Sequence, residues 1–174
     1  MSLLRVAVIA FDGISPFHLS VPSLVLGEMA NGDTQRFVVE VCAEQSICRT
    51  SAGFDIHVHA DLGITTQADI VIVPSWSAPT QQPSAAIIAA LQAADTRRAQ
   101  IVGLCLGAYV LAAAGLLNGR CATTHWAFVA DFAQRYPKVM LQPTVLYVAQ
   151  DHLLTSAGTA AALDCCLHCV REHY

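Results

Sequence analysis

The chain has 174 residues, a length typical of one domain with a substantial core, and we expect a single domain over residues 1–174. Hydrophobic residues make up 55% of it and charged residues only 13%, which favours a buried sheet and self-association into an oligomer. The formal net charge is −4 and no run of lysine and arginine occurs, which excludes nucleic-acid binding through the charge of this chain alone.

Seven cysteines are present, an odd number without the spacing of a secreted disulfide scaffold. We therefore expect reduced thiols and a cytoplasmic location. The apolar stretch Leu3–Phe11 is interrupted by Arg5 and is too short for a signal sequence or a membrane span, so we expect no membrane contact.

Strands and helices alternate along the chain. Leu4–Ala10 is a continuous apolar run, typical of a strand buried on both faces. Pro16 suits the first turn of a helix over Ser15–Met29, which Asn31–Asp33 should end. Further strands are predicted at Phe37–Ala43, Asp69–Val73, Gln100–Leu104, Cys121–Thr123, Val145–Ala149 and His152–Thr155, with a small antiparallel pair within Ile47–Val58. Further helices are predicted at Ser84–Arg97, Cys105–Leu117, Trp126–Arg135 and Thr159–His173.

This alternation predicts the fold class. Parallel strands joined by right-handed crossovers give a doubly wound, mostly parallel, flavodoxin-like α/β sheet with helices on both faces.

The sharpest chemical signal is a Gly-x-Cys-x-Gly sequence around Cys105, between a predicted strand and a predicted helix. This pattern is the cysteine form of a nucleophile elbow, in which small flanking residues permit a strained turn. The start of a helix favours thiolate over thiol, so we expect a lowered pKa for Cys105. The alternative is a buried structural cysteine.

A histidine follows about one helix later. His125 stands in Thr-Thr-His-Trp after a short predicted strand, where its imidazole could reach the thiol. The competing interpretation is a histidine that caps a helix or packs against its neighbours.

Together these motifs resemble the ThiJ/PfpI branch of the class I glutamine amidotransferase-like superfamily. The stretch Gly103–Trp126 is most similar to the amino-terminal domains of FtrA-like, AraC-family transcriptional regulators. The resemblance runs from Leu4 to Glu172. Other similar stretches are Phe11–Phe17, Val73–Trp76 and Leu154–Asp164.

The resemblance implies a site. Cys105 would be the reactive cysteine and His125 its neighbour, with backbone N–H groups near Trp76 and Leu106 as an oxyanion pocket. The same cleft would be lined by Ser156, Gly158 and Thr159.

One position departs from the family pattern. The resemblance places a carboxylate on the first helix, and this chain has His18 there. A histidine could pair with a thiolate as imidazolium or pack neutrally, so chemistry that depends on a carboxylate is in doubt.

Two other patterns are weaker. His57 and His59 share one face of a strand, but no third metal ligand is evident nearby in the sequence. Cys166 and Cys169 form a Cys-x-x-Cys pair, but they lie well inside the last predicted helix. We expect no metal and no cofactor.

By resemblance, the leading function is a ligand-sensing, dimerising domain of an AraC-family regulator. Its partners would be a second copy, a small molecule, and DNA only through a helix-turn-helix region absent from these 174 residues. The alternatives are a cysteine-dependent hydrolase, hydratase or glyoxalase-like enzyme, and a redox sensor acting through Cys105.

Overall fold

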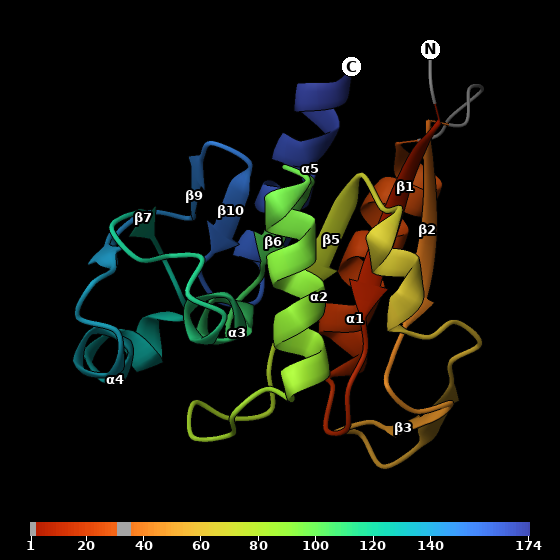
Figure 1. Cartoon of the computed structure of the whole chain (residues 1–174), viewed down its shortest axis with the longest axis horizontal. Helices are drawn as coiled ribbons and strands as arrows, with labels where there is room; N and C mark the ends of the chain where they lie inside the picture. Colours follow the sequence, from red (N-terminus) through yellow and green to blue (C-terminus); the bar gives the residue numbers. More distant parts are fainter. Residues whose placement is uncertain (1–2, 31–35) are drawn as a thin grey trace.

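A six-stranded sheet in the order β2-β1-β5-β6-β10-β9 runs through the molecule (Figure 1). The computed structural model describes residues 3–30 and 36–174, so the predicted helix end at Asn31–Asp33 lies outside the described residues. Five neighbouring strands are parallel: β1 (Leu4–Ile9), β2 (Phe37–Cys42), β5 (Ile70–Val73), β6 (Gln100–Gly103) and β10 (Leu153–Ser156). The edge strand β9 (Tyr147–Gln150) is antiparallel to β10.

The predicted fold class is confirmed. The strand order is that of a flavodoxin-like sheet with an added antiparallel edge, and every residue of β5 is buried, as its continuous apolar run predicted. Two small ribbons lie outside the main sheet: β3 (Ile47–Arg49) with β4 (Asp55–His57), and β7 (Cys121–Ala122) with β8 (Met140–Leu141).

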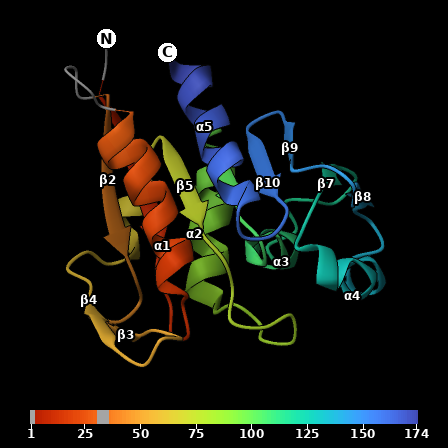
Figure 2. The same cartoon turned by 180° about the vertical axis from the view of Figure 1, so that it is seen from behind.

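Helices cover both faces of the sheet. On one face, α1 (Pro16–Pro22) continues directly as the π-helical segment η1 (Ser23–Met29) and packs beside α5 (Ala161–His173) over the side chains of β1 (Figure 2). On the other face lie α2 (Ala85–Thr96), α3 (Gly107–Ala113) and the short 3₁₀ helix η2 (Leu62–Thr66). A second 3₁₀ turn, η3 (Trp126–Phe128), leads into α4 (Val129–Arg135) near β7 and β8.

Two helices differ from the sequence prediction, and two short elements are additional to it. The helix over Ser15–Met29 changes from α to π directly after Pro22, which has no N–H to donate to the preceding turn. Cys105 lies outside α3 because its φ is +55°, and the helix ends before Gly115, whose φ is +81°. Two short elements, η2 and β8, were not predicted.

None of the helices in the described parts of the chain is long and apolar enough to cross a membrane.

Candidate functional site around Cys105

Cys105 stands at the turn between β6 and α3 in a left-handed conformation, with φ of +55°. Its flanking glycines make this turn possible. A Cβ on Gly107 would lie 2.3 Å from the backbone oxygen of Val73, and one on Gly103 would lie 3.0 Å from the backbone carbon of Gly107. The predicted nucleophile elbow is therefore present, and its glycines are required by close backbone approach.

The backbone of the elbow is held by two side chains, one from the end of β10 and one from the segment after β7. The N–H of Cys105 donates to Oγ of Ser156 at 3.3 Å, and Oγ1 of Thr124 donates to the carbonyl oxygen of Cys105 at 3.1 Å. Both side chains are fully buried. Ser156 thus supports the elbow from the carboxyl end of β10, while Thr124 connects it to the segment that carries His125.

The thiol of Cys105 is buried, with 4% of the residue exposed. Burial raises its pKa above the ordinary value, and hydrogen bonds from the backbone N–H groups of Thr159 and Leu106 and from the side chain of Ser75 oppose that rise. The net direction is upward, so the expected lowering of the Cys105 pKa is wrong. Loss of solvation outweighs the hydrogen bonds, and the thiol form is favoured at neutral pH.

His125 follows Thr124 in the chain and is partly exposed. Its Nδ1 accepts a hydrogen bond from the N–H of Ala127 at 3.2 Å, so the residue caps η3, and its ring stacks on Trp126 with centroids 5.5 Å apart. A Cβ on Gly158 would lie 2.3 Å from Cδ2 and 2.8 Å from Nε2 of this ring. With Nδ1 used as an acceptor, a neutral imidazole carries its proton on Nε2, on the side of Gly158.

His18 faces this site from α1. Both its ring nitrogens are buried, and neither has a hydrogen-bond partner among the described residues. Burial lowers the pKa of His18 and the charge of His125 lowers it further, so His18 is neutral at physiological pH. A neutral imidazole offers one donor and one acceptor, and the residues that the structure describes leave both without a partner here.

The predicted site residues therefore fall into two groups. The elbow and the N–H groups of Leu106 and Thr159 meet at the thiol, while His125 packs against Gly158 and interacts electrostatically with His18. The side chain of Trp76 does not join them. Its ring packs against Phe11 with centroids 4.7 Å apart, and its Nε1 donates to the carbonyl oxygen of Gln81 at 2.8 Å. Trp76 lines a separate cavity of about 260 Å³.

Sequence reasoning missed two members of the site, Ser75 and Thr124. Ser75 follows β5 and lies beside the thiol, because the carboxyl ends of parallel strands meet at one edge of the sheet. That rule could have identified it, since it directly follows a predicted buried strand. Thr124 had no signal beyond its place next to His125.

The weaker motifs show no further site. Among residues 3–30 and 36–174, no group of three or more histidine, cysteine or acidic side chains is placed to hold a metal. Cys165, Cys166 and Cys169 are fully buried free thiols inside α5, packed against the sheet.

Comparison with known proteins identifies relatives of both functional classes. The model of the DJ-1/PfpI family matches residues 4–172. An uncharacterised protein in the cpoL 5′ region of Streptomyces lividans is 34% identical over 134 residues, which is 76% of this chain and 95% of that protein. The HTH-type transcriptional regulator CdhR of Pseudomonas aeruginosa is 27% identical over 156 residues, 90% of this chain but 46% of the regulator.

An isonitrile hydratase of Pseudomonas putida is 37% identical over 81 residues, 47% of this chain and 33% of that enzyme. Among solved structures, an AraC family transcriptional regulator from Pseudomonas putida has a TM-score of 0.83 at 19% identity, over 98% of this chain and 92% of that one. This chain spans less than half the length of CdhR and of the hydratase.

Proposed function

Because this chain belongs to the DJ-1/PfpI family, we propose that it is the ligand-sensing and dimerising domain of an AraC-family transcriptional regulator, acting in the cytoplasm. One observation carries the proposal: the similarity to CdhR extends over 90% of this chain but only 46% of the regulator. That proportion fits a sensor domain that is one part of a longer regulator. The composition agrees, because a net charge of −4 gives these 174 residues no basic surface for phosphates.

The chemistry of the pocket favours binding over turnover. A nucleophilic cysteine needs its thiolate, and burial disfavours the thiolate of Cys105. The ring nitrogens of His18 are also buried, and neither has a hydrogen-bond partner in the part of the chain that the structure describes. An unpaired buried polar group is costly unless a ligand or water satisfies it. A small polar molecule bound beside Cys105 would satisfy both nitrogens, and this supports a sensing role.

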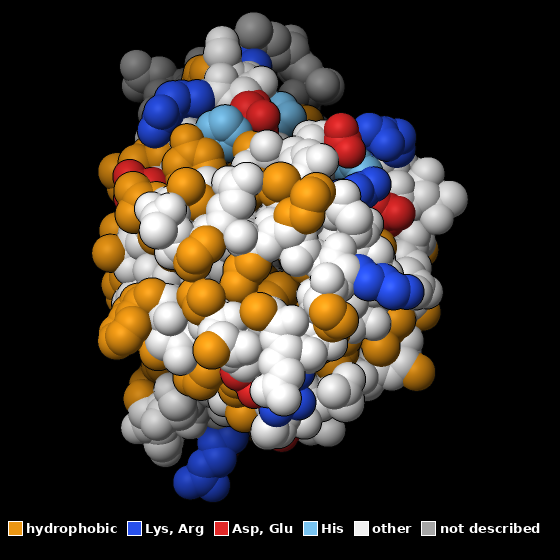
Figure 3. Space-filling model, turned by 90° about the vertical axis from the view of Figure 1, so that its left-hand side faces the viewer, with side chains coloured by type: hydrophobic (Ala, Val, Ile, Leu, Met, Phe, Trp, Pro, Cys, Tyr) orange, Lys and Arg blue, Asp and Glu red, His pale blue; other side chains and the backbone are white. Residues whose placement is uncertain are grey.

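Composition favoured self-association without indicating a surface, and the last helix is not proposed as the interface. The cysteines of α5 are buried within the domain and provide no apolar exterior. Instead, three large apolar side chains are exposed near α4, β8 and β9: Trp126, Met140 and Leu146. Figure 3 views the molecule from that side, where hydrophobic and uncharged side chains fill the centre and charged ones lie mainly toward the margin. A second copy covering this face would remove the apolar side chains from water.

The enzyme alternative is kept because an isonitrile hydratase is 37% identical to this chain over 81 residues. In that case Cys105 would attack the substrate and His125 would move the proton. His18 stands where a carboxylate would be expected from the resemblance, and a neutral imidazole is a weaker acid partner for a thiol than a carboxylic acid is.

The two functions are separated by one experiment on the purified chain. A thermal-shift screen of small polar metabolites should identify a molecule that raises Tm, and the shift should be lost in His18→Phe and kept in His59→Gln, a variant of an exposed histidine. In parallel, small isonitriles, amides and aldehydes are offered to the wild type, to His18→Glu and to Cys105→Ser. Turnover by the wild type that disappears in Cys105→Ser would overturn the sensor proposal and establish the enzyme.

A further inference from the structure

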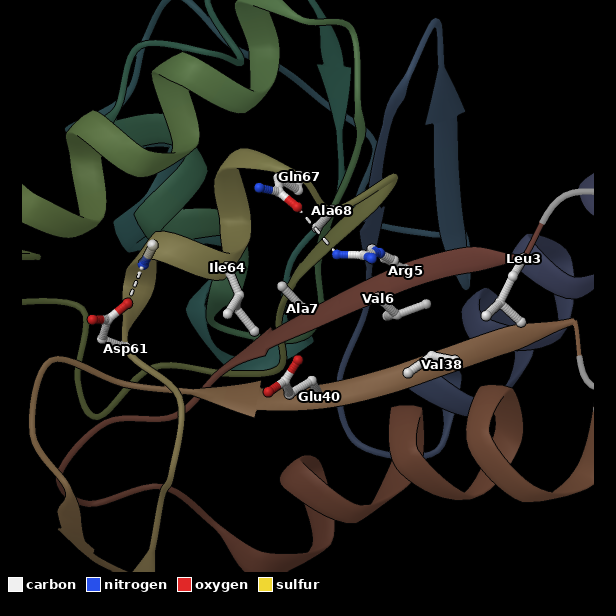
Figure 4. A pocket seen from close by; sticks show the side chains of 11 residues that line it. Leu3, Arg5, Val6, Ala7, Val38, Glu40, Asp61, Ile64, Gln67 and Ala68 are labelled. Carbon is white, nitrogen blue, oxygen red and sulfur yellow. Dashed lines mark hydrogen bonds between the residues drawn. The ribbon is translucent and has the colours of Figure 1, made fainter.

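A second cavity, of about 530 Å³, lies over β1 and β2 on the face of the sheet that also carries η2 (Figure 4). Its volume is in the range that holds small-molecule ligands. It shares no residue with the candidate site around Cys105, and the proposal made for it stands independently of that site. We refer to it as the β1/β2 groove.

The groove exists because this part of the sheet has little cover. The 3₁₀ helix η2 has only five residues, and it is the element that packs beside β1 at this edge. Beyond it, Val38 is half-buried and Glu40 exposed on the edge strand β2. Ala7, Val38 and Ile64 form an apolar floor and wall between the two ends of the groove.

Opposite charges stand at the two ends. Arg5 pairs in register with Val38 and Ala7 pairs with Glu40, so the Cα atoms of Arg5 and Glu40 lie on a diagonal of about 8 Å. Within the described parts of the chain, neither side chain forms an ion pair. Arg5 is held by Gln67 instead, since its Nη1 donates to Oε1 of Gln67 at 3.1 Å.

The acidic end contains two carboxylates. Glu40 and Asp61 both lie near the buried thiol of Cys42, whose pKa burial raises to about 12 with a further contribution from these two charges. Asp61 uses Oδ1 to accept the N–H of Gly63 at the start of η2. The carboxylate of Glu40 has no hydrogen-bond partner in residues 3–30 and 36–174, and it points into the groove in Figure 4.

We propose that the β1/β2 groove binds a small zwitterion, with its carboxylate against Arg5, its ammonium against Glu40 and an apolar spacer over Ala7 and Ile64. A guanidinium has five N–H donors in a planar fork, and Gln67 uses one of them while fixing its direction. The remaining donors suit a carboxylate, and the two neighbouring acidic groups suit a cation. A ligand with only one charge would leave one end of the groove without a partner.

The test uses 6-aminohexanoate as the probe, with hexanoate and hexylamine as analogues that each lack one charge. Binding to the purified chain is measured by calorimetry and mapped by amide NMR shifts. The zwitterion should bind about fivefold more tightly than either analogue, which is the upper range for a solvent-accessible ion pair. Its shifts should fall on β1, β2 and η2.

Variants then distinguish binding in the groove from attraction to surface charge elsewhere on the molecule. Binding of the zwitterion should be weakened about fivefold by Arg5→Gln and by Glu40→Gln. It should be unchanged in the control variants Arg49→Gln and Asp55→Asn, whose positions are exposed. The double exchange of Arg5→Glu with Glu40→Arg should restore binding, because a zwitterion can bind in the reverse direction. Cys105→Ser should have no effect, which keeps this result distinct from the sensing pocket.

The proposal is overturned if the probe does not bind, if the three probes bind equally, or if the shifts fall outside the groove. It is also overturned if the charge exchange fails to restore binding in a variant whose circular dichroism and Tm match those of the wild type.

Discussion

Gly158 and His125 are in contact so close that a single methyl group on Gly158 would lie 2.3 Å from Cδ2 of the imidazole. The turn between β10 and α5 therefore determines where this histidine can lie. His125 in turn caps η3 through Nδ1, so the position of one glycine affects both the pocket and the start of the segment that leads into α4.

Replacing Gly158→Ala should displace His125 and break its hydrogen bond to the N–H of Ala127. Loss of such a cap costs about 1 kcal/mol, so the free energy of unfolding should fall by about that amount in urea titrations. In a His125→Ala background the same change should cost only a few tenths of a kcal/mol, because the clash is gone. An equal loss of unfolding free energy in both backgrounds would show that contact with the His125 ring does not cause the destabilisation.

The pKa of Cys105 can be read from the pH dependence of its alkylation by iodoacetamide, followed by peptide mass spectrometry. Because burial raises this pKa, the midpoint should lie above the ordinary thiol value of about 8.5. Ser75→Ala removes a hydrogen bond that lowers the pKa, so its midpoint should move higher still. Ser77→Ala, whose hydroxyl donates to the carbonyl oxygen of Asp12, is the matched control. A wild-type midpoint below 8.5 would mean that the hydrogen bonds outweigh burial.

Acid should destabilise the fold through His18. Its pKa is lowered in the folded state, so the unfolded chain binds more protons once the pH falls below its ordinary value of about 6.5. The stabilisation is present above that pH and is lost as the pH falls toward the folded pKa. Urea titrations at several pH values should show this slope, and His18→Gln should reduce it. The exposed variant His59→Gln should keep the wild-type slope, and a slope unchanged in His18→Gln would contradict the assignment.

Self-association should be visible by sedimentation at micromolar concentration as a two-subunit species. Trp126 is 74% exposed, and Trp126→Gln should shift the equilibrium toward the monomer if its face is the interface. Leu24→Gln, at an exposed position on η1, should leave the equilibrium unchanged. A wild type that is strictly monomeric would exclude the dimer.

Much of the fold was predictable because its signals are local. Apolar runs such as Ile70–Val73, rich in β-branched residues, are typical of strands buried on both faces, and the glycines around Cys105 indicate a turn that the structure contains. The short strand β8 gave no signal, since two residues carry no periodicity. The π-helical turn of η1 depends on Pro22, whose effect within an otherwise helical stretch is difficult to anticipate.

The site was predicted less completely, for a physical reason. The direction of the Cys105 pKa depends on how much protein surrounds the sulfur, which is a tertiary property with no local pattern. The contribution of Ser75 likewise comes from the loop after β5, about thirty residues earlier, which the parallel sheet brings alongside. Sequence motifs identified the elbow but not Ser75 or Thr124, nor the balance between burial and hydrogen bonding at the sulfur.

The buried cysteines have one more consequence. Cys42 lies at the end of β2, Cys48 on β3, and Cys165, Cys166 and Cys169 on α5, and all five are shielded from solvent. A thiol reagent can reach them only when the surrounding structure opens, so their modification rates measure the free energy of local or global opening at each place. Without any introduced label, the chain can thus report whether the β3/β4 ribbon separates before α5 leaves the sheet.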